Sequence, residues 1–222
     1  MMRHEFPAIG TRIVTTSEDP AAVVEFFARA ESVLSRFGPD SELSRVNADP
    51  TAEVLVSDTL AGCLDEANYL RKITDGLVDP AVGNAVVGWG YDRSFGDGLD
   101  RESAGLVQAI GQWEIKGNVV HRRPGVLLDL GGIAKGWVAD QAVSSGLATM
   151  VSAGGDVRSN LPDTVVAIED PWGQVAAQVS LGCGGLATSS STRRTANIRS
   201  RRASGSAARH RPARPPPRCS DA

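Results

Sequence analysis

The chain has 222 residues, of which 41% are hydrophobic and 22% charged, and its formal net charge at pH 7 is −3. This length and composition predict one globular domain with a sizeable core. No stretch approaches ~18 consecutive apolar residues, so no membrane span is expected. The first residues, Met1 to Pro7, lack the apolar segment of a secretory signal, and a cytoplasmic location is therefore expected.

The three cysteines, Cys63, Cys183 and Cys219, are widely spaced and form no C-x-x-C motif. An odd set of this kind argues against a disulfide scaffold and against a zinc site. Buried or incidental thiols are the expectation for all three.

Residues 195–222 differ in composition from the rest of the chain, because they hold seven arginines and one acidic residue, Asp221. Arg, Ala, Ser and Pro dominate there, and such a segment cannot bury enough apolar surface to offset the entropy of ordering. A basic arm of this kind could bind nucleic acid. We favour an Arg/Pro-rich tail that is disordered or translated out of frame, and expect no nucleic-acid partner.

The first part of the chain predicts helices that alternate with short strands. Asp19 followed by Pro20 is typical of a helix start, and the apolar periodicity after it runs toward Gly38. Residues 54–56 predict a short strand, and Ser57 is the expected N-cap of a second helix.

The later part mixes strands and helices without a regular βαβ rhythm. We expect a lining segment, a short helix, a hairpin turn and two strands, at residues 76–90, 102–111, 117–118, 165–168 and 175–181. This order favours an α+β fold with mixed, largely antiparallel sheets and packed helices over a doubly wound sheet.

The most informative stretch is residues 126–140. The apolar run from Val126 to Leu130 predicts a buried strand, Gly131 and Gly132 allow a tight turn, and the apolar residues that follow recur at helical spacing. A helix start behind a glycine turn offers unpaired N–H groups and the positive end of a dipole to a phosphate.

The charges in this stretch do not settle what it does. Asp129 and Lys135 flank the turn, but neither a G-x-G-x-x-G motif nor a P-loop is present. An ordinary strand–turn–helix corner with a surface lysine accounts for these residues about as well as a phosphate site.

The stretch resembles the D-L-G-G-I-A-K-G-Y motif of the ApbE family, the FAD:protein FMN transferases, with Trp137 where that family usually has Tyr. Further segments resemble the family's motifs in the family's order, and the resemblance covers roughly residues 6–194. It implies an ApbE-like flavin transferase domain over residues 1–194 that is incomplete at its C-terminal end. The other matching segments are 9–11, 37–47, 74–83, 89–91, 153–157 and 187–190.

The resemblance implies an enzyme that transfers FMN from FAD to a Thr side chain of a target flavoprotein and releases AMP. FAD is then a substrate, Mg²⁺ a cofactor and a flavin-accepting protein the partner, because phosphoryl transfer of this kind needs its developing charge neutralised. Two alternatives stay open: a catalytically inactive flavin-binding remnant, and a FAD hydrolase giving FMN and AMP. The family's Asp-Ala-x-x-Thr helix and His-Ile-Ile-Asp-Pro segment find no counterpart after Arg194.

The family's motifs also imply site residues, none of them assigned as catalytic. Asp129 and Lys135 match FAD-contacting positions, and Gly132 matches the position whose backbone carbonyl binds the metal. Structural alternatives remain for several positions: a turn-shaping role for Asp79, core filling for Phe37, and ordinary turn or strand-end roles for Asp156 and Thr188. The remaining flavin-contacting positions are Ile9, Phe37, Leu77, Val78 and Asp79.

Overall fold

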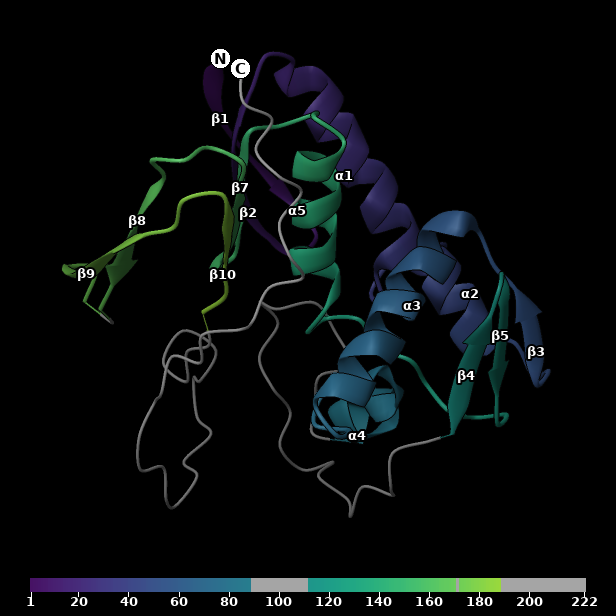
Figure 1. Ribbon diagram of the computed structural model, residues 1–222. Helices are drawn as coiled ribbons and strands as arrows, with labels where there is room; N and C mark the ends of the chain where they lie inside the picture. Colours follow the sequence, from purple (N-terminus) through teal and green to yellow (C-terminus); the bar gives the residue numbers. More distant parts are fainter. Residues whose placement is uncertain (89–111, 171, 189–222) are drawn as a thin grey trace. The chain divides into compact units, whose positions relative to one another are not determined.

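The computed structural model describes residues 1–88, 112–170 and 172–188 (Figure 1). The expected helix at 102–111 and the tail at 195–222 lie outside the described residues. Within the described part, no helix is long and apolar enough to cross a membrane. The chain divides into two compact units: unit 1 is Met1–Glu5, Ile13–Val23 and Ala139–Ala222, and unit 2 is Phe6–Arg12 and Val24–Val138.

Five strands form the larger sheet, in the order β1-β2-β6-β7-β10. The β2–β6, β6–β7 and β7–β10 pairs are antiparallel, and Ile13 lies opposite Ala153 in the buried part of the sheet. A separate antiparallel pair is formed by β8 and β9. The bounds are β1 Met2–Ala8, β2 Thr11–Ser17, β6 Met150–Ala153, β7 Asp156–Ser159, β8 Val165–Glu169, β9 Val175–Ser180 and β10 Gly184–Leu186.

Unit 2 contains a three-stranded antiparallel sheet in the order β3-β5-β4, and α3 lies against β4 (Figure 1). Two helices, α1 and α5, run from one unit into the other. The bounds are α1 Pro20–Leu34, α2 Glu42–Ala48, β3 Glu53–Leu55, α3 Asp58–Ile73, η1 Pro80–Val82, α4 Gly83–Gly88, β4 Trp113–Lys116, β5 Val119–Arg122 and α5 Ala134–Ser144.

Local capping explains where the two long helices begin. The Asp19 carboxylate accepts a hydrogen bond from the amide of Ala22 (3.0 Å), and the Ser57 hydroxyl accepts one from Leu60 (3.3 Å). Each side chain satisfies one amide that the first helical turn leaves without a partner. Both predicted helix starts are therefore confirmed.

The predicted hairpin and the strands predicted at residues 54–56, 165–168 and 175–181 are also confirmed, and the class is α+β as expected. Gly117 adopts a φ of 55° between β4 and β5, which few other residues tolerate. Asp170 closes the turn between β8 and β9, because its carboxylate accepts hydrogen bonds from the amides of Trp172 and Gln174.

The strand predicted at Val126–Leu130 is wrong. The segment is extended and buries Val126, Leu128 and Leu130 in alternation, but it belongs to none of the sheets among the described residues. The segment expected to line a site at 76–90 is partly helical, since it contains η1 and α4. Both differences have one cause: residues of α2, η1 and α4 form hydrogen bonds with the backbone of segment 125–129.

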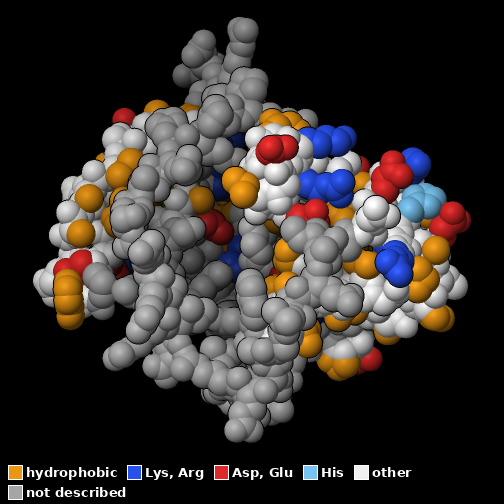
Figure 2. Space-filling model, turned by 90° about the horizontal axis from the view of Figure 1, so that it is seen from below, with side chains coloured by type: hydrophobic (Ala, Val, Ile, Leu, Met, Phe, Trp, Pro, Cys, Tyr) orange, Lys and Arg blue, Asp and Glu red, His pale blue; other side chains and the backbone are white. Residues whose placement is uncertain are grey.

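Apolar side chains also reach the surface. On the face seen in Figure 2, hydrophobic side chains lie among charged and other polar ones. Leu77, which follows α3, exposes 90% of its surface and is the most exposed large hydrophobic residue of the described part.

The described residues include two of the three cysteines. Cys63 is a free thiol buried in α3, and burial raises its pKa to about 12. Cys183 lies just before β10, with its sulfur 3.0 Å from the carbonyl oxygen of Asn160. Cys219 lies outside the described residues.

We expect Cys63 to resist alkylation in the folded protein. At pH 8 the thiolate is the reacting form, and both burial and the raised pKa keep its concentration low. Labelling by iodoacetamide, followed by mass spectrometry, is expected to be on the order of 100-fold slower in buffer than in urea. The Cys63→Ala variant identifies the slow site, and equal rates in buffer and urea would contradict the prediction.

Candidate functional site

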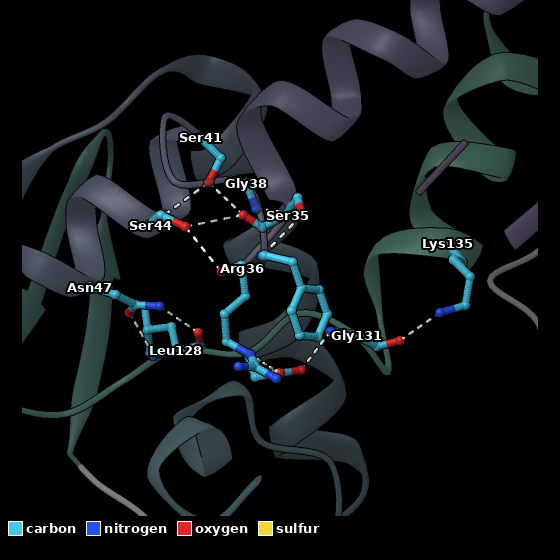
Figure 3. Close-up of polar contacts among 11 residues, drawn as sticks. Ser35, Arg36, Gly38, Ser41, Ser44, Asn47, Leu128, Gly131 and Lys135 are labelled. Carbon is cyan, nitrogen blue, oxygen red and sulfur yellow. Dashed lines mark hydrogen bonds and ion pairs between the residues drawn. The ribbon is translucent and has the colours of Figure 1, made fainter. Parts of the chain in front are cut away.

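A compact polar turn joins α1 to α2 and gives a role to the serines of the 37–47 motif (Figure 3). Ser41 is the N-cap of α2: its hydroxyl accepts a hydrogen bond from the amide of Ser44 (3.1 Å) and donates one to the carbonyl of Ser35 (2.5 Å). The Ser44 hydroxyl donates to the carbonyl of Arg36 (3.1 Å). These bonds fix the backbone from which the Arg36 side chain extends.

The glutamate of the same motif joins two helices. Both oxygens of the Glu42 carboxylate accept hydrogen bonds from Ser57, one from its amide and one from its hydroxyl, each at 2.6 Å. Since Ser57 caps α3 and Glu42 lies in the first turn of α2, the two helix starts are tied together.

Asn47, at the end of the motif, holds one edge of the extended segment 125–129. Its side-chain amide donates to the carbonyl of Leu128 and accepts from the amide of Leu128, both at 2.8 Å (Figure 3). A side-chain amide has the same donor and acceptor pair as a peptide group. Asn47 therefore takes the place of a neighbouring strand.

A second asparagine, Asn84, binds the same segment. It donates to the carbonyl of Gly125 (3.1 Å) and accepts from the amide of Leu127 (2.8 Å). Together the two asparagines explain why this apolar run needs no sheet: their side chains satisfy polar backbone groups that a strand ladder would otherwise pair.

The backbone beside Asn84 adds two more bonds. The amide of Gly83 donates to the carbonyl of Leu127 (3.0 Å), and the amide of Asp129 donates to the carbonyl of Pro80 (2.7 Å). A Cβ atom at Gly83 would lie 2.5 Å from the Leu127 oxygen. Only glycine allows this approach, which accounts for the last residue of the 74–83 motif.

Asp79 lies just before these contacts and has protein partners for both carboxylate oxygens. One oxygen accepts from the amide of Ala81 and from the indole N–H of Trp113, each at 2.8 Å, and Arg71 Nε lies 3.7 Å from the other. The side chain is 8% exposed. Asp79 thus shapes the turn into η1, which is the structural alternative that the sequence left open.

Thr74 and the two residues after it end α3 in a tight cap. The Thr74 hydroxyl donates to the carbonyl of Leu70 (2.7 Å) and accepts from the amide of Val78 (3.1 Å). Asp75 and Gly76 both adopt positive φ, 52° and 79°. Leu77 follows this turn with its side chain in solvent, and Val78 is half-buried.

Asp129 lies at the centre of the glycine turn. Its Oδ2 pairs with Arg36 Nε at 2.6 Å, and its Oδ1 accepts from the amide of Gly131 at 2.8 Å. The Lys135 ammonium donates to the carbonyl of Gly131 at 3.0 Å (Figure 3). The carboxylate and the lysine that the sequence selected are therefore both bonded to the backbone of one residue, Gly131.

The turn leads directly into α5. The amides of Ile133 and Ala134 both donate to the carbonyl of Leu130, at 2.9 and 2.8 Å. Gly132, the residue before Ile133, is exposed, its φ is not positive, and no described atom lies within 4 Å of where a Cβ would stand. Neither backbone angle nor packing against the described residues requires glycine at this position.

Two apolar candidates differ in their setting. Ile9 is half-buried in the two-residue turn between β1 and β2, with φ 45° beside Gly10 at 68°. A β-branched residue at such an angle is an outlier. Phe37 is 40% exposed, and the guanidinium carbon of Arg36 lies 4.4 Å from its ring centroid.

In the described part of the chain, four of the candidate site residues are thus linked to one another by a chain of contacts, whereas others are not. Phe37, Asp129 and Lys135 are linked through Arg36 and Gly131, and Asp79 joins this group through Pro80. Ile9 lies in the turn between β1 and β2, and no hydrogen bond or ion pair among the described residues links it to this group. Sequence reasoning missed Arg36 and Asn84, although each stands beside a residue of a recognised motif.

Unit 1 contains the remaining pair of candidates. The Thr188 hydroxyl donates to the carbonyl of Gly155 (2.9 Å), in the hairpin between β6 and β7 that also holds Asp156. Gly155 has φ 106°, and a Cβ there would lie 2.4 Å from the Thr188 hydroxyl oxygen. Both features fit a structural role for Thr188.

The described residues do not build a complete metal centre. Among them, no three side chains of the His, Cys, Asp or Glu type are grouped to hold a metal ion. The Gly132 carbonyl could supply one ligand, whereas Mg²⁺ requires near-octahedral oxygen coordination. The residues in this part of the chain therefore do not fit the ion by themselves.

The protein is therefore an α+β protein with an exposed glycine turn, Gly131–Gly132, at the start of α5. The side chains of Asp129 and Lys135 hold this turn through hydrogen bonds to Gly131. The chain belongs to the ApbE family, whose model matches residues 9–210. The predicted family is confirmed.

Proteins named FAD:protein FMN transferase are similar to this chain. The one from Vibrio cholerae is 34% identical over 137 residues, covering 56% of this chain and 41% of that protein. The one from Haemophilus influenzae is 27% identical over 217 residues, covering 81% and 59%. The chain therefore spans about half the length of the curated relatives it matches.

Solved structures agree with the fold. The flavin transferase ApbE from Vibrio cholerae matches with a TM-score of 0.70 and 25% identity, covering 90% of this chain and 74% of that one. The ApbE protein from Thermotoga maritima matches with a TM-score of 0.69 and 27% identity, covering 85% and 70%.

Proposed function

We propose that this chain transfers FMN from FAD to a threonine side chain of a partner flavoprotein and releases AMP. The observation that carries the proposal is the exposed turn at Gly131–Gly132, pinned between Asp129 and Lys135 in a member of the ApbE family. The names of the similar proteins support flavin transfer as the reaction class.

The turn at Gly131–Gly132 and the start of α5 together have the chemistry to bind the linked phosphates of a dinucleotide. The positive end of the α5 helix dipole lies at this turn, and Lys135, the second residue of the helix, adds a positive charge. Gly132 lets a ligand approach the backbone where a side chain would stand in the way. These features favour a bound anion over the ordinary corner considered from the sequence.

The other candidates take supporting roles in this proposal. Asp129 contacts FAD in the orientation that Arg36 and Gly131 give it. Phe37, Leu77, Val78 and Ile9 supply apolar surface for the isoalloxazine. Asp79 acts through the turn that it holds, because its carboxylate is buried against its protein partners.

The transfer itself is a substitution at phosphorus. The hydroxyl oxygen of the acceptor threonine forms a bond to the FMN phosphorus, the bond between that phosphorus and the bridging oxygen breaks, and AMP leaves with the electron pair. The threonine proton is lost in the same reaction. Mg²⁺ belongs to the proposal through the family resemblance, and among the described residues the Gly132 carbonyl is the ligand proposed for it.

The test is transfer of flavin to protein. With FAD, Mg²⁺ and a flavoprotein that carries an acceptor threonine, we expect a covalent, fluorescent band on a denaturing gel that is lost with EDTA. Lys135→Met is expected to lower the rate at least about tenfold, since a charge-assisted contact is removed. Lys116→Met, at an exposed position of β4, is the matched control and keeps the wild-type rate.

The same experiment separates the alternatives. AMP released from FAD without any acceptor indicates the hydrolase, and quenching of flavin fluorescence without transfer indicates the non-catalytic remnant. If the wild-type chain neither binds FAD nor transfers flavin, the proposed function is refuted.

A further inference from the structure

Arg36 immediately precedes the 37–47 motif and contacts both Asp129 and Phe37. We infer that Arg36 is a positioning residue, which sets the orientation of Asp129 and cancels its charge where the dinucleotide binds. This inference rests on the proposed function, because it concerns the use of Asp129 in binding FAD.

The first support is the geometry of the pair. Arg36 Nε lies 2.6 Å from Asp129 Oδ2, and the two side chains are only 11% and 13% exposed. Charge-assisted hydrogen bonds of this length are among the stronger ones, and low exposure reduces competition from water and salt. The contact joins the end of α1 to the glycine turn, 93 residues further along the chain.

The second support is that the arginine is held before any ligand arrives. Its carbonyl accepts a hydrogen bond from the Ser44 hydroxyl, and the carbonyl before it accepts one from Ser41. Its guanidinium lies over the ring of Phe37 at 4.4 Å. A side chain restrained at both ends loses little conformational freedom when it fixes its partner.

The third support is the position of Asp129 itself. Its other oxygen accepts from the amide of Gly131, so the orientation of the carboxylate and of the turn are coupled. A lone carboxylate beside the turn would repel a pyrophosphate, and the Arg36 guanidinium offsets that charge. Each carboxylate oxygen keeps a further lone pair, which can accept a hydrogen bond from FAD.

The experiment compares FAD binding across a mutant cycle, with quenching of flavin fluorescence as the readout. Arg36→Met is expected to raise the dissociation constant about tenfold or more, and Arg36→Lys to stay within about threefold of wild type. In the Asp129→Asn background, adding Arg36→Met is expected to change affinity less than about twofold, since both residues act through one group. Arg29→Met, in α1 and with an exposed ion pair to Glu25, is the matched control.

A second measurement needs no flavin. Hydrogen exchange at the amide of Gly131, followed by NMR, is expected to be faster in Arg36→Met than in wild type and unchanged in Arg29→Met. The Gly131 amide donates to the Asp129 carboxylate, and Arg36→Met removes the guanidinium that fixes this carboxylate. Thermal unfolding of each variant shows whether it is folded. Failure of the wild-type chain to bind FAD counts against the proposed function, whereas the exchange result bears on Arg36 alone.

Two results would overturn the inference. One is an Arg36→Met variant that binds FAD as tightly as wild type; the other is an equal loss of affinity in the wild-type and Asp129→Asn backgrounds. Unchanged exchange at Gly131 in a folded Arg36→Met protein would also count against it.

Discussion

Replacing Arg122 by methionine is expected to lower the free energy of unfolding by about 3–5 kcal/mol, because three carbonyls lose their donor and each buried acceptor left unsatisfied costs about 1–3 kcal/mol. Arg122 is 3% exposed, and its guanidinium donates to the carbonyls of Val46, Asp49 (2.5 Å) and Val126 (3.1 Å). These carbonyls lie at the end of α2 and at the start of the extended segment that leads to the glycine turn. Methionine cannot donate a hydrogen bond, so these carbonyls lose the donor that the guanidinium supplies.

The measurement is urea unfolding followed by circular dichroism, with Arg123→Met as the control. Arg123 is the next residue and is exposed, so its replacement is expected to change stability by less than about 0.5 kcal/mol. Burial lowers the pKa of Arg122, and the Asp49 carboxylate partly offsets this. An arginine nevertheless stays charged near neutral pH, so the effect should be the same at pH 6 and pH 8. A loss below about 1 kcal/mol would show that the three carbonyls find other donors.

Gly83→Ala is the second change with a large expected effect. A Cβ atom there would lie 2.5 Å from the Leu127 oxygen and 2.7 Å from the carbonyl carbon, both of them backbone atoms. Relief requires the segment 125–129 to move, and overpacking of this kind costs about 1–3 kcal/mol. The bond from the Gly83 amide to Leu127 would be strained or lost as well. We expect the free energy of unfolding to fall by about 2–3 kcal/mol and the affinity for FAD to fall with it.

Gly136→Ala provides the matched control, since it adds the same methyl group. No described atom lies within 4 Å of that Cβ position, and alanine favours a helix over glycine by up to about 1 kcal/mol. Its thermal unfolding temperature is therefore expected to stay the same or rise. Equal losses in the two variants would show that contact with Leu127 is not the cause.

Local signals in the sequence predicted the elements well. Asp19 and Ser57 begin helices because their side chains satisfy nearby amides, and the Gly117 turn closes a hairpin because glycine accepts its backbone angle. These are interactions between residues a few positions apart. A different signal, the series of motifs in the family's order, predicted the ApbE family, and the family match over residues 9–210 confirms it.

The segment 126–130 shows where local reasoning failed. Alternating burial of Val126, Leu128 and Leu130 is what a strand would give, yet its backbone is satisfied by Asn47 and Asn84 instead of by a strand ladder. An asparagine that replaces a strand leaves no periodic pattern in the sequence. The helix α2 was missed as well, although Ser41 is a favourable cap, because it is only seven residues long.

By itself, the sequence determined the starts of the two long helices, the hairpin at residues 117–118, the α+β class and the family, because these depend on neighbours along the chain and on motifs with fixed spacing. Tertiary structure alone decided that Arg36 meets Asp129 and that Arg122 lies between α2 and the extended segment. These contacts join residues far apart in the chain, and nothing in the spacing of two charged residues indicates whether folding brings them together. The same holds for Gly83, whose need to be glycine arises from the backbone of Leu127.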